Sequence, residues 1–380
     1  IDTPDGGNIG LHKHMAITSH ITTGSSSYPM IRWLRLKANM KMLAECTPYI
    51  ISTMCKVIVN GNWVGVLSDP KETELLFKEY RRVALIPIFI SIQWNIAKNT
   101  LFIYTDSGRL CRPIFYISKE GKPSYENNSV LENISNNKFT WEQLITGFGK
   151  KKDENFIYKN YNLYNKPADL YNVTNIKDLK SANAIIDYLD TSETESALIA
   201  MYPEYLSENK QYTHIEIHPS FMLGVMGNQI VFPENNQLPR DLFACGQAKQ
   251  AVSLYHSNFQ TRMDKMGVVL NNGQVPLVQS RSLQYINNEE HPCGENVIVA
   301  IMSYNGYNVE DSILFNEGAL KRGMFRTTYY TMYESKEESS KVATSQVDKR
   351  FVNIEKENVI GLKPGYDYSE LDEYGLIREN

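Results

Sequence analysis

The sequence predicts a multidomain α+β fold, and three observations lead to this prediction. Its 380 residues are enough for two or three domains. Apolar residues make up 42% of the chain and charged residues 22%, which is the balance of an ordinary folded protein. Helix-start signals also alternate along the chain with short runs of strand-forming residues, which is typical of a mixed architecture.

The N-terminal part carries signals for a helix followed by a hairpin. Residues 31–54 have apolar side chains at helical spacing and predict a helix. Residues 56–59 and 63–67 are rich in strand formers, and Asn60-Gly61 lies between them. Because Asn and Gly tolerate the left-handed backbone of a tight turn, this pair strongly favours a hairpin.

The next segments predict a helix and a second hairpin. Asp69-Pro70-Lys71-Glu72 combines an N-cap residue, a proline at the first helical position and an acid at the third. The helix that it opens is expected to run to about Arg82. Residues 101–104 and 110–116 then predict two strands joined across Asp106-Ser107-Gly108.

Residues 140–143 have the pattern of a capping box and predict a short helix. The segment that follows, residues 150–181, is rich in Lys, Asn and Tyr and has only weak periodicity. We interpret it as an insertion.

In the second half of the chain, residues 214–218 alternate polar and apolar side chains as a half-buried strand does. Residues 242–266 contain no proline and end before Gly267, which predicts one long helix. Residues 325–333 again alternate like a strand, and the remaining residues are expected to begin a new β-rich unit.

The formal net charge of −4 gives no global sign of a nucleic-acid-binding protein, so any basic surface must be local. The stretch from residue 240 to 281 is a candidate for such a surface. Its charged side chains are mostly basic: Arg240, Lys249, Arg262, Lys265 and Arg281 stand against Asp241 and Asp264.

The five cysteines contain no C-x-x-C pair, so no zinc site is expected. Their odd number and the lack of a signal peptide favour a reducing compartment. No run of about 18 apolar residues occurs, so no membrane span is expected. The sequence starts at Ile1 inside a turn-rich segment, and we interpret it as an internal fragment of a longer polypeptide.

The most informative segment is GYNVEDS at residues 306–312. Residues 297–301 predict a strand, and Ser312 is placed to cap a short helix that ends near Gly323. The intervening loop therefore presents Glu310 and Asp311. Such a loop suits carboxylates that bind a divalent metal or a cationic partner, and acids that only stabilise a helix dipole are the alternative.

These residues do not stand alone. The chain resembles the second-largest subunit of multisubunit DNA-directed RNA polymerases along nearly its whole length and in one collinear order, and it fits the eukaryotic, archaeal and large-DNA-virus branch better than the bacterial one. The strings that carry the resemblance are DTPDGGNIGL (2–11), VNGNW (59–63), YTDSGR (104–109), HIEIHPSFMLGV (214–225), FPENNQLPR (232–240), QAKQAV (247–252) and GYNVEDS.

The resemblance implies a domain order. Residues 1–54 would be a fork segment that connects to the lobe, and residues 55–212 a hairpin-based external domain that includes the insertion. Residues 213–333 would be the first part of a hybrid-binding domain with a β-barrel-like core. Residues 334–380 would begin the β-rich wall, also called the flap.

The resemblance also implies site residues. Asp311 and Glu310 would help to place the second, nucleotide-borne Mg²⁺ of a two-magnesium nucleotidyl transfer, with Asp311 the closer group. Arg240 would bind the incoming triphosphate, although a surface ion pair with Asp241 is the alternative. Lys249, Gln250, Arg262 and Asn8 would contact nucleic acid, and solvated surface or turn positions are the alternative for them. Phe243 stands where cellular enzymes usually have tyrosine.

The implied partners are the largest polymerase subunit, smaller assembly subunits, template DNA, the RNA–DNA hybrid and nucleoside triphosphates. The aspartate-triad loop for the catalytic metal would lie on the largest subunit, so we expect the chain to be inactive alone. An intracellular location is expected: the nucleus, or the cytoplasm or virion if a virus encodes the protein. The alternative function is a non-catalytic nucleic-acid-binding or assembly module of a degenerate paralogue.

Overall fold

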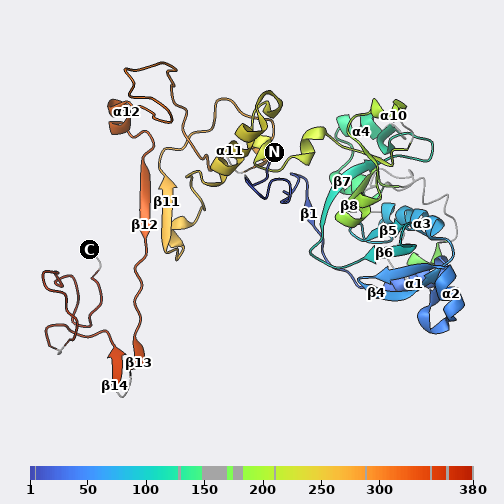
Figure 1. Ribbon diagram of the computed structural model, residues 1–380, viewed down its shortest axis with the longest axis horizontal. Helices are drawn as coiled ribbons and strands as arrows, with labels where there is room; N and C mark the ends of the chain where they lie inside the picture. Colours follow the sequence, from blue (N-terminus) through green and yellow to red (C-terminus); the bar gives the residue numbers. More distant parts are fainter. Residues whose placement is uncertain are drawn as a thin grey trace. The chain divides into compact units, whose positions relative to one another are not determined.

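The computed structural model describes residues 1–4, 6–126, 130–147, 169–173, 183–208, 211–286, 289–342, 345–356 and 359–378. The chain forms two compact units (Figure 1). Unit 1 comprises Ile1–Gln250 with Val278–Ile286, and unit 2 comprises Ala251–Leu277 with Asn287–Asn380. The predicted insertion at 150–181 lies outside the described residues except for 169–173.

One five-stranded sheet of unit 1 has the order β2-β4-β3-β6-β5. Its strands are β2 (Lys41–Met42), β3 (Cys55–Val59), β4 (Asn62–Leu67), β5 (Ser91–Asn95) and β6 (Thr100–Tyr104). The β3–β4 hairpin confirms the prediction, and Asn60 and Gly61 have φ values of 48° and 82°, as its tight turn requires.

Two helices pack their apolar faces into the core of this sheet: α1 (Tyr28–Lys37) and α3 (Pro70–Arg82). Trp33 of α1 is fully buried, and its ring meets Phe77 and Tyr80 of α3 edge-on at 5.5 and 5.2 Å. The predicted helix at residues 69–82 is therefore confirmed, with Asp69 at the N-cap position.

The predicted single helix at 31–54 is wrong. Residue Asn39 adopts φ 52°, which ends α1, and the chain continues through β2, a 3₁₀ turn at Leu43–Glu45 and α2 (Pro48–Thr53). The apolar spacing was real, but it belongs to two short helices that are separated by a strand. Asn in the left-handed region commonly terminates a helix.

The second sheet of unit 1 is built on β7 (Leu110–Tyr116). It follows the order β1-β7-β10-β9, with β8 also paired to β7. The other strands are β1 (His20–Ile21), β8 (Ile186–Asp190), β9 (Ile199–Ala200) and β10 (His214–Ile215). The predicted hairpin between 101–104 and 110–116 is wrong, because β6 and β7 belong to different sheets.

Short helices complete unit 1: α4 (Val130–Ser135), α5 (Trp141–Thr146), α7 (Asp169–Asn172), α9 (Thr191–Glu195), α10 (Tyr205–Glu208) and α11 (Leu238–Lys249). The predicted capping box before α5 is present, since the Thr140 backbone N–H donates to Gln143 Oε1 at 2.9 Å.

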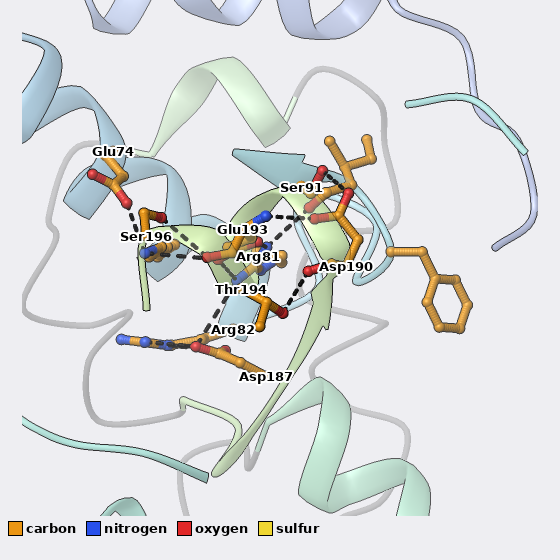
Figure 2. A network of polar contacts seen from close by, with 12 residues as sticks. Glu74, Arg81, Arg82, Ser91, Asp187, Asp190, Glu193, Thr194 and Ser196 are labelled. Carbon is orange, nitrogen blue, oxygen red and sulfur yellow. Dashed lines mark hydrogen bonds and ion pairs between the residues drawn. The ribbon is translucent and has the colours of Figure 1, made fainter. Parts of the chain in front are cut away.

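A buried ionic network joins α3 to the β8–α9 segment (Figure 2). Arg81 donates to both oxygens of Glu193 at 2.7 and 2.8 Å, and Arg82 donates to Asp187 at 2.7 Å. Asp190 caps α9 by accepting the Glu193 backbone N–H at 2.8 Å. This cap fixes the residue that neutralises Arg81, so the network stabilises one relative position of helix and strand.

The described residues of unit 2 form two antiparallel strand pairs and a short helix. The strands β11 (Met266–Leu270) and β12 (Thr327–Thr331) lie side by side, with Met266 opposite Thr331 (Figure 1). The pair β13 (Glu338–Val342) and β14 (Ser345–Lys349) confirms strands beyond residue 333, and α12 spans Glu317–Lys321.

The described strands show a mixed α and β structure with several sheets, but they do not close the β-barrel-like core that was expected. Residues 297–301 are not a paired strand in the described part of the chain, and Ile298 and Ile301 are fully exposed. An apolar run predicts an extended segment, but only a hydrogen-bonded neighbour makes it a strand. None of the described helices has the length and apolar character needed to cross a membrane.

Candidate catalytic and nucleic-acid-binding site

The loop with the acidic pair is shaped by Asn308. Its side-chain amide donates to the Met302 carbonyl at 2.6 Å, and its Oδ1 accepts the Tyr304 backbone N–H at 3.0 Å. Asn305 and Gly306 turn the chain between these contacts with φ values of 51° and 77°. The Asn308 side chain thus closes the turn immediately before the acids.

Glu310 and Asp311 are both exposed. Within the ranges that the structure describes, neither carboxylate has a hydrogen-bond or ion-pair partner. Glu310 adopts φ 61°, a left-handed conformation that costs a non-glycine residue about 1 kcal/mol or more. The two acids are therefore free to bind an external cation.

The helix after the loop begins later than predicted. Asn316, rather than Ser312, is the N-cap of α12, and its Oδ1 accepts the Ala319 backbone N–H at 2.9 Å. Asn and Ser are comparable N-caps, and here the chain becomes helical only after residue 316. The acids consequently lie six and five residues before the cap, which argues against a role as helix-dipole partners.

The acidic pair fits magnesium as a partial ligand set. No group of three or more His, Cys, Asp or Glu side chains able to hold a metal occurs among the described residues. Carboxylate oxygens are the ligands that Mg²⁺ prefers, and Mg²⁺ usually keeps several waters or phosphate oxygens. Two carboxylates can therefore assist an ion that a phosphate already holds.

Arg240 lies in the first turn of α11 and is exposed. Its guanidinium carbon is 5.8 Å from the ring centre of Phe243, one helical turn further on. Asp241 is buried, and no ion pair joins it to Arg240 in the described structure. The alternative, a surface ion pair between Arg240 and Asp241, is therefore wrong. The Arg240 charge remains available to an anion.

Lys249 and Gln250 lie at the C-terminal end of α11 and are exposed. Lys249 Nζ pairs with Asp2 Oδ1 at 2.9 Å, and this hydrogen bond raises the pKa of Lys249. Asn8 lies in an exposed turn of the same N-terminal segment as Asp2. The structure therefore links the lysine to the segment that carries Asn8, and Asp2 compensates part of the lysine charge.

Arg262 is not on the same helix as Lys249. The predicted helix at 242–266 is wrong, because α11 ends at Lys249 and the following segment contains only a 3₁₀ turn at Phe259–Thr261 before β11. The Arg262 Nε lies 3.0 Å from Asp264 Oδ2, and this contact lowers the pKa of Asp264. The arginine thus already has an ionised partner.

Comparison with known proteins shows matches to one protein family in successive segments of the chain. The family model described as RNA polymerase Rpb2, domain 4, matches residues 57–118. The models for domains 5 and 6 of the same family match residues 177–219 and 226–380. DNA-directed RNA polymerase II subunit RPB2 of Schizosaccharomyces pombe is 32% identical and covers 99% of this chain. DNA-directed RNA polymerase subunit Rpo2 of Sulfolobus acidocaldarius is 30% identical and covers 100% of it.

The chain belongs to the family of second-largest RNA polymerase subunits. The resemblance inferred from the ordered motifs is thereby confirmed. RPB2 of Encephalitozoon cuniculi is a further relative, with 31% identity to this chain. The chain spans only 30–31% of the length of these RPB2 and Rpo2 relatives.

The candidate residues of this RPB2-like chain are divided between its two units. Unit 1 carries Asn8, Arg240, Lys249 and Gln250, and unit 2 carries Arg262, Glu310 and Asp311. All except Asn8 fall inside the segment that matches Rpb2 domain 6. Within unit 1, the structure brings Lys249 to the N-terminal segment.

Sequence reasoning missed the partners of these residues. Asp2 was not expected beside Lys249, and Asp264 was counted only as a charge near Arg262. Arg281 was one member of a basic stretch, without any sign of the side chains that hold it. Only the pair Arg262 and Asp264, two residues apart, had a local signal in the sequence.

Proposed function

We propose that the chain is part of the catalytic core of DNA-directed RNA polymerase, where it contributes to template-directed nucleotidyl transfer from nucleoside triphosphates to an RNA 3′ end. The match of residues 226–380 to Rpb2 domain 6 carries the proposal, because this span contains Arg240 and the unpartnered Glu310-Asp311 pair. The reaction would use two magnesium ions and a site shared with the largest subunit.

Asp311 and Glu310 would help to seat the magnesium ion that accompanies the triphosphate, with Asp311 the closer group. That ion would neutralise charge on the phosphate oxygens while a nucleotide is added to the RNA. The exposure of both acids and their lack of partners in the described structure support this role. The left-handed backbone at Glu310 turns the chain sharply between Val309 and Asp311.

Arg240 would orient the triphosphate. A guanidinium can donate two parallel hydrogen bonds to phosphate oxygens, which an ammonium cannot. Its position over the Phe243 ring is compatible with a weak cation–π contact that limits the side chain's freedom before the nucleotide binds. The phenylalanine supplies this ring without the hydroxyl of the tyrosine that cellular enzymes usually have.

Lys249, Gln250, Arg262 and Asn8 would contact the RNA–DNA hybrid. The two cations would exchange carboxylate partners, Asp2 and Asp264, for phosphates. Each exchange breaks an existing ion pair, so the net gain per phosphate is smaller than for an unpaired cation. Gln250 is exposed and can reach a sugar or a base edge.

The remaining parts of the proposal concern assembly. The largest subunit would supply the aspartate triad, and smaller subunits would support assembly. Residues 1–54, 55–212, 213–333 and 334–380 would act as fork, external domain, hybrid-binding domain and wall. The assembled enzyme would work inside the cell, in the nucleus or at a viral cytoplasmic site.

The direct test is Asp311→Asn in the assembled polymerase, with nucleotide addition measured across a magnesium titration. We expect a loss of about 10–100-fold in activity that added magnesium partly restores, because a weakened metal ligand acts through ion affinity. Glu317→Gln is the matched control, since Glu317 is exposed and pairs with Lys321 on its own helix. Near-normal addition by the Asp311 variant at every magnesium concentration would favour a non-catalytic binding or assembly module.

A further inference from the structure

Arg281 lies on a segment that is anchored firmly in unit 1. Val278–Ile286 returns to this unit from unit 2, and Asn228 holds it there. Ser280 Oγ donates to the Asn228 carbonyl, and Ser282 Oγ donates to Asn228 Oδ1 at 3.4 Å. The buried Asn228 Nδ2 in turn lies 3.0–3.1 Å from three backbone carbonyl oxygens, those of Ser220, Leu223 and Gly224, which share its two N–H groups. The backbone on both sides of Arg281 is therefore fixed.

The Arg281 guanidinium is held by neutral groups. Its Nη2 lies 3.0 Å from each ring nitrogen of His218, of which only the unprotonated one can accept a hydrogen bond, and it donates to Ser220 Oγ at 3.1 Å. Burial and the nearby Arg281 charge lower the pKa of His218, which favours the uncharged imidazole. No carboxylate pairs with Arg281 in the described part of the chain, and the side chain is exposed.

This arrangement differs from those of Lys249 and Arg262. Lys249 and Arg262 each pair with an aspartate at 2.9 and 3.0 Å. No carboxylate in the described part of the chain compensates the charge of Arg281, and its contacts already restrict the side chain. Binding an anion there requires neither the loss of an ion pair nor the ordering of a free side chain.

The stretch that contacts Arg281 is also joined to the N-terminal segment that carries Asn8. The His14 Nε2 lies 3.2 Å from the Met222 carbonyl, and the Ile17 backbone N–H donates to the Leu223 carbonyl at 2.9 Å. These carbonyls belong to the short stretch that follows His218 and Ser220. The same N-terminal segment reaches Lys249 through Asp2. Arg281, this segment and the end of α11 are thus linked within unit 1.

We propose that Arg281 is a further residue of the nucleic-acid-binding surface, where it contacts a backbone phosphate of the RNA–DNA hybrid. The proposal rests on the function proposed above. His218 and Ser220 act as positioning residues, because they hold the guanidinium and carry no charge that competes with the phosphate.

The test measures binding of the assembled polymerase to an RNA–DNA hybrid scaffold at several salt concentrations. Removing one phosphate contact reduces the slope of log K against log[salt] by about 0.7–0.9. We expect this reduction for Arg281→Ala and an unchanged slope for Arg281→Lys, which keeps the charge. Arg35→Ala is the control, because Arg35 is exposed in unit 1 and pairs with Glu45 at 2.7 Å.

The KM for nucleoside triphosphate separates two sources of phosphate, and Arg281→Ala should leave it unchanged. A raised KM with an unchanged salt slope would overturn the proposal by assigning the residue to the nucleotide. If Arg281→Ala changed neither the salt slope nor the KM, the proposal for Arg281 would also be overturned. The proposed function would still stand in that case, because the wild-type enzyme binds the hybrid. Failure of the wild-type assembly to bind the hybrid at all would overturn both.

Discussion

The ion pair between Arg81 and Glu193 allows a quantitative prediction about the stability of unit 1. Both side chains are almost fully buried, with 2% and 1% of their surface exposed. The guanidinium donates two hydrogen bonds to the carboxylate at 2.7 and 2.8 Å, and a third to the Ile90 carbonyl at 3.0 Å. The perturbation is Glu193→Gln, which keeps the side-chain volume and removes the charge.

The expected loss follows from the charge that is left behind. After the substitution, the nearest carboxylate oxygen to Arg81 among its remaining ion-pair partners is that of Asp187, at 3.9 Å from Nη2. Breaking a buried pair in this way costs about 3–5 kcal/mol. For a unit of this size, that loss corresponds to a fall in Tm of about 6–20 °C. Replacing both partners, as in Arg81→Met with Glu193→Leu, should recover most of the loss, because neither charge of this pair is then buried without the other, and Asp187 keeps Arg82 as its partner.

Urea unfolding followed by tryptophan fluorescence is a suitable assay. All four tryptophans, residues 33, 63, 94 and 141, belong to unit 1, so the signal reports this unit alone. The control is Glu45→Gln, which removes an exposed partner of Arg35 and should cost at most about 1 kcal/mol. A Glu193→Gln loss no larger than that of the control would refute the reasoning, as would a double variant whose loss equals the sum of the two single losses.

Two further predictions use the same unfolding assay. Burial lowers the pKa of His214 from 6.5 although Asp187 lies nearby, and Arg82 lowers the pKa of Asp187 well below 3.8 against the opposing effect of burial. Both pKa values are lower in the folded state than in the unfolded state, so protonation of either group favours unfolding. Unit 1 should therefore lose stability below about pH 6.5 because of His214, and again below about pH 4 because of Asp187. His214→Gln should abolish the first of these losses. Gly65→Ala should cost about 1–3 kcal/mol, because the new Cβ would meet the Lys41 carbonyl oxygen, whereas Gly246→Ala in the open face of α11 should not destabilise. Equal stability of the two alanine variants would contradict the packing argument.

The sequence predicted the elements whose signals are local. The hairpin at Asn60-Gly61 and the helix that begins after Asp69 each depend on a few adjacent residues, and both are present. The turn at 106–108 is also a local signal, but it does not state which strands pair. β6 pairs in parallel with β3, with Leu101 opposite Val57, and this partner is far away in the sequence. Strand pairing is therefore where the prediction failed.

The predicted helix at 242–266 failed for a different reason. A stretch without proline lacks one helix breaker, but it needs an apolar face that packs to remain helical. α11 buries Asp241 and Cys245, and the exposed residues after Gln250 offer no such face. Residues 297–301 show the converse case, since they are apolar but find no paired strand in the described structure.

The candidate site shows the same division between identity and arrangement. Motif order supplied the acids and the cations as candidates, because each motif is a contiguous string. Whether a cation is free depends on partners that are distant in sequence: Asp2 and Lys249 are 247 residues apart, and His218 and Arg281 are 63 apart. The sequence treats Arg262 and Arg281 as equal members of one basic stretch. Among the described residues, Arg262 has an ionised partner and Arg281 has only uncharged ones, so the two should differ in their contribution to salt-dependent binding. The sequence shows which side chains are charged, but the fold decides which of these charges lack an ion-pair partner and can bind a ligand.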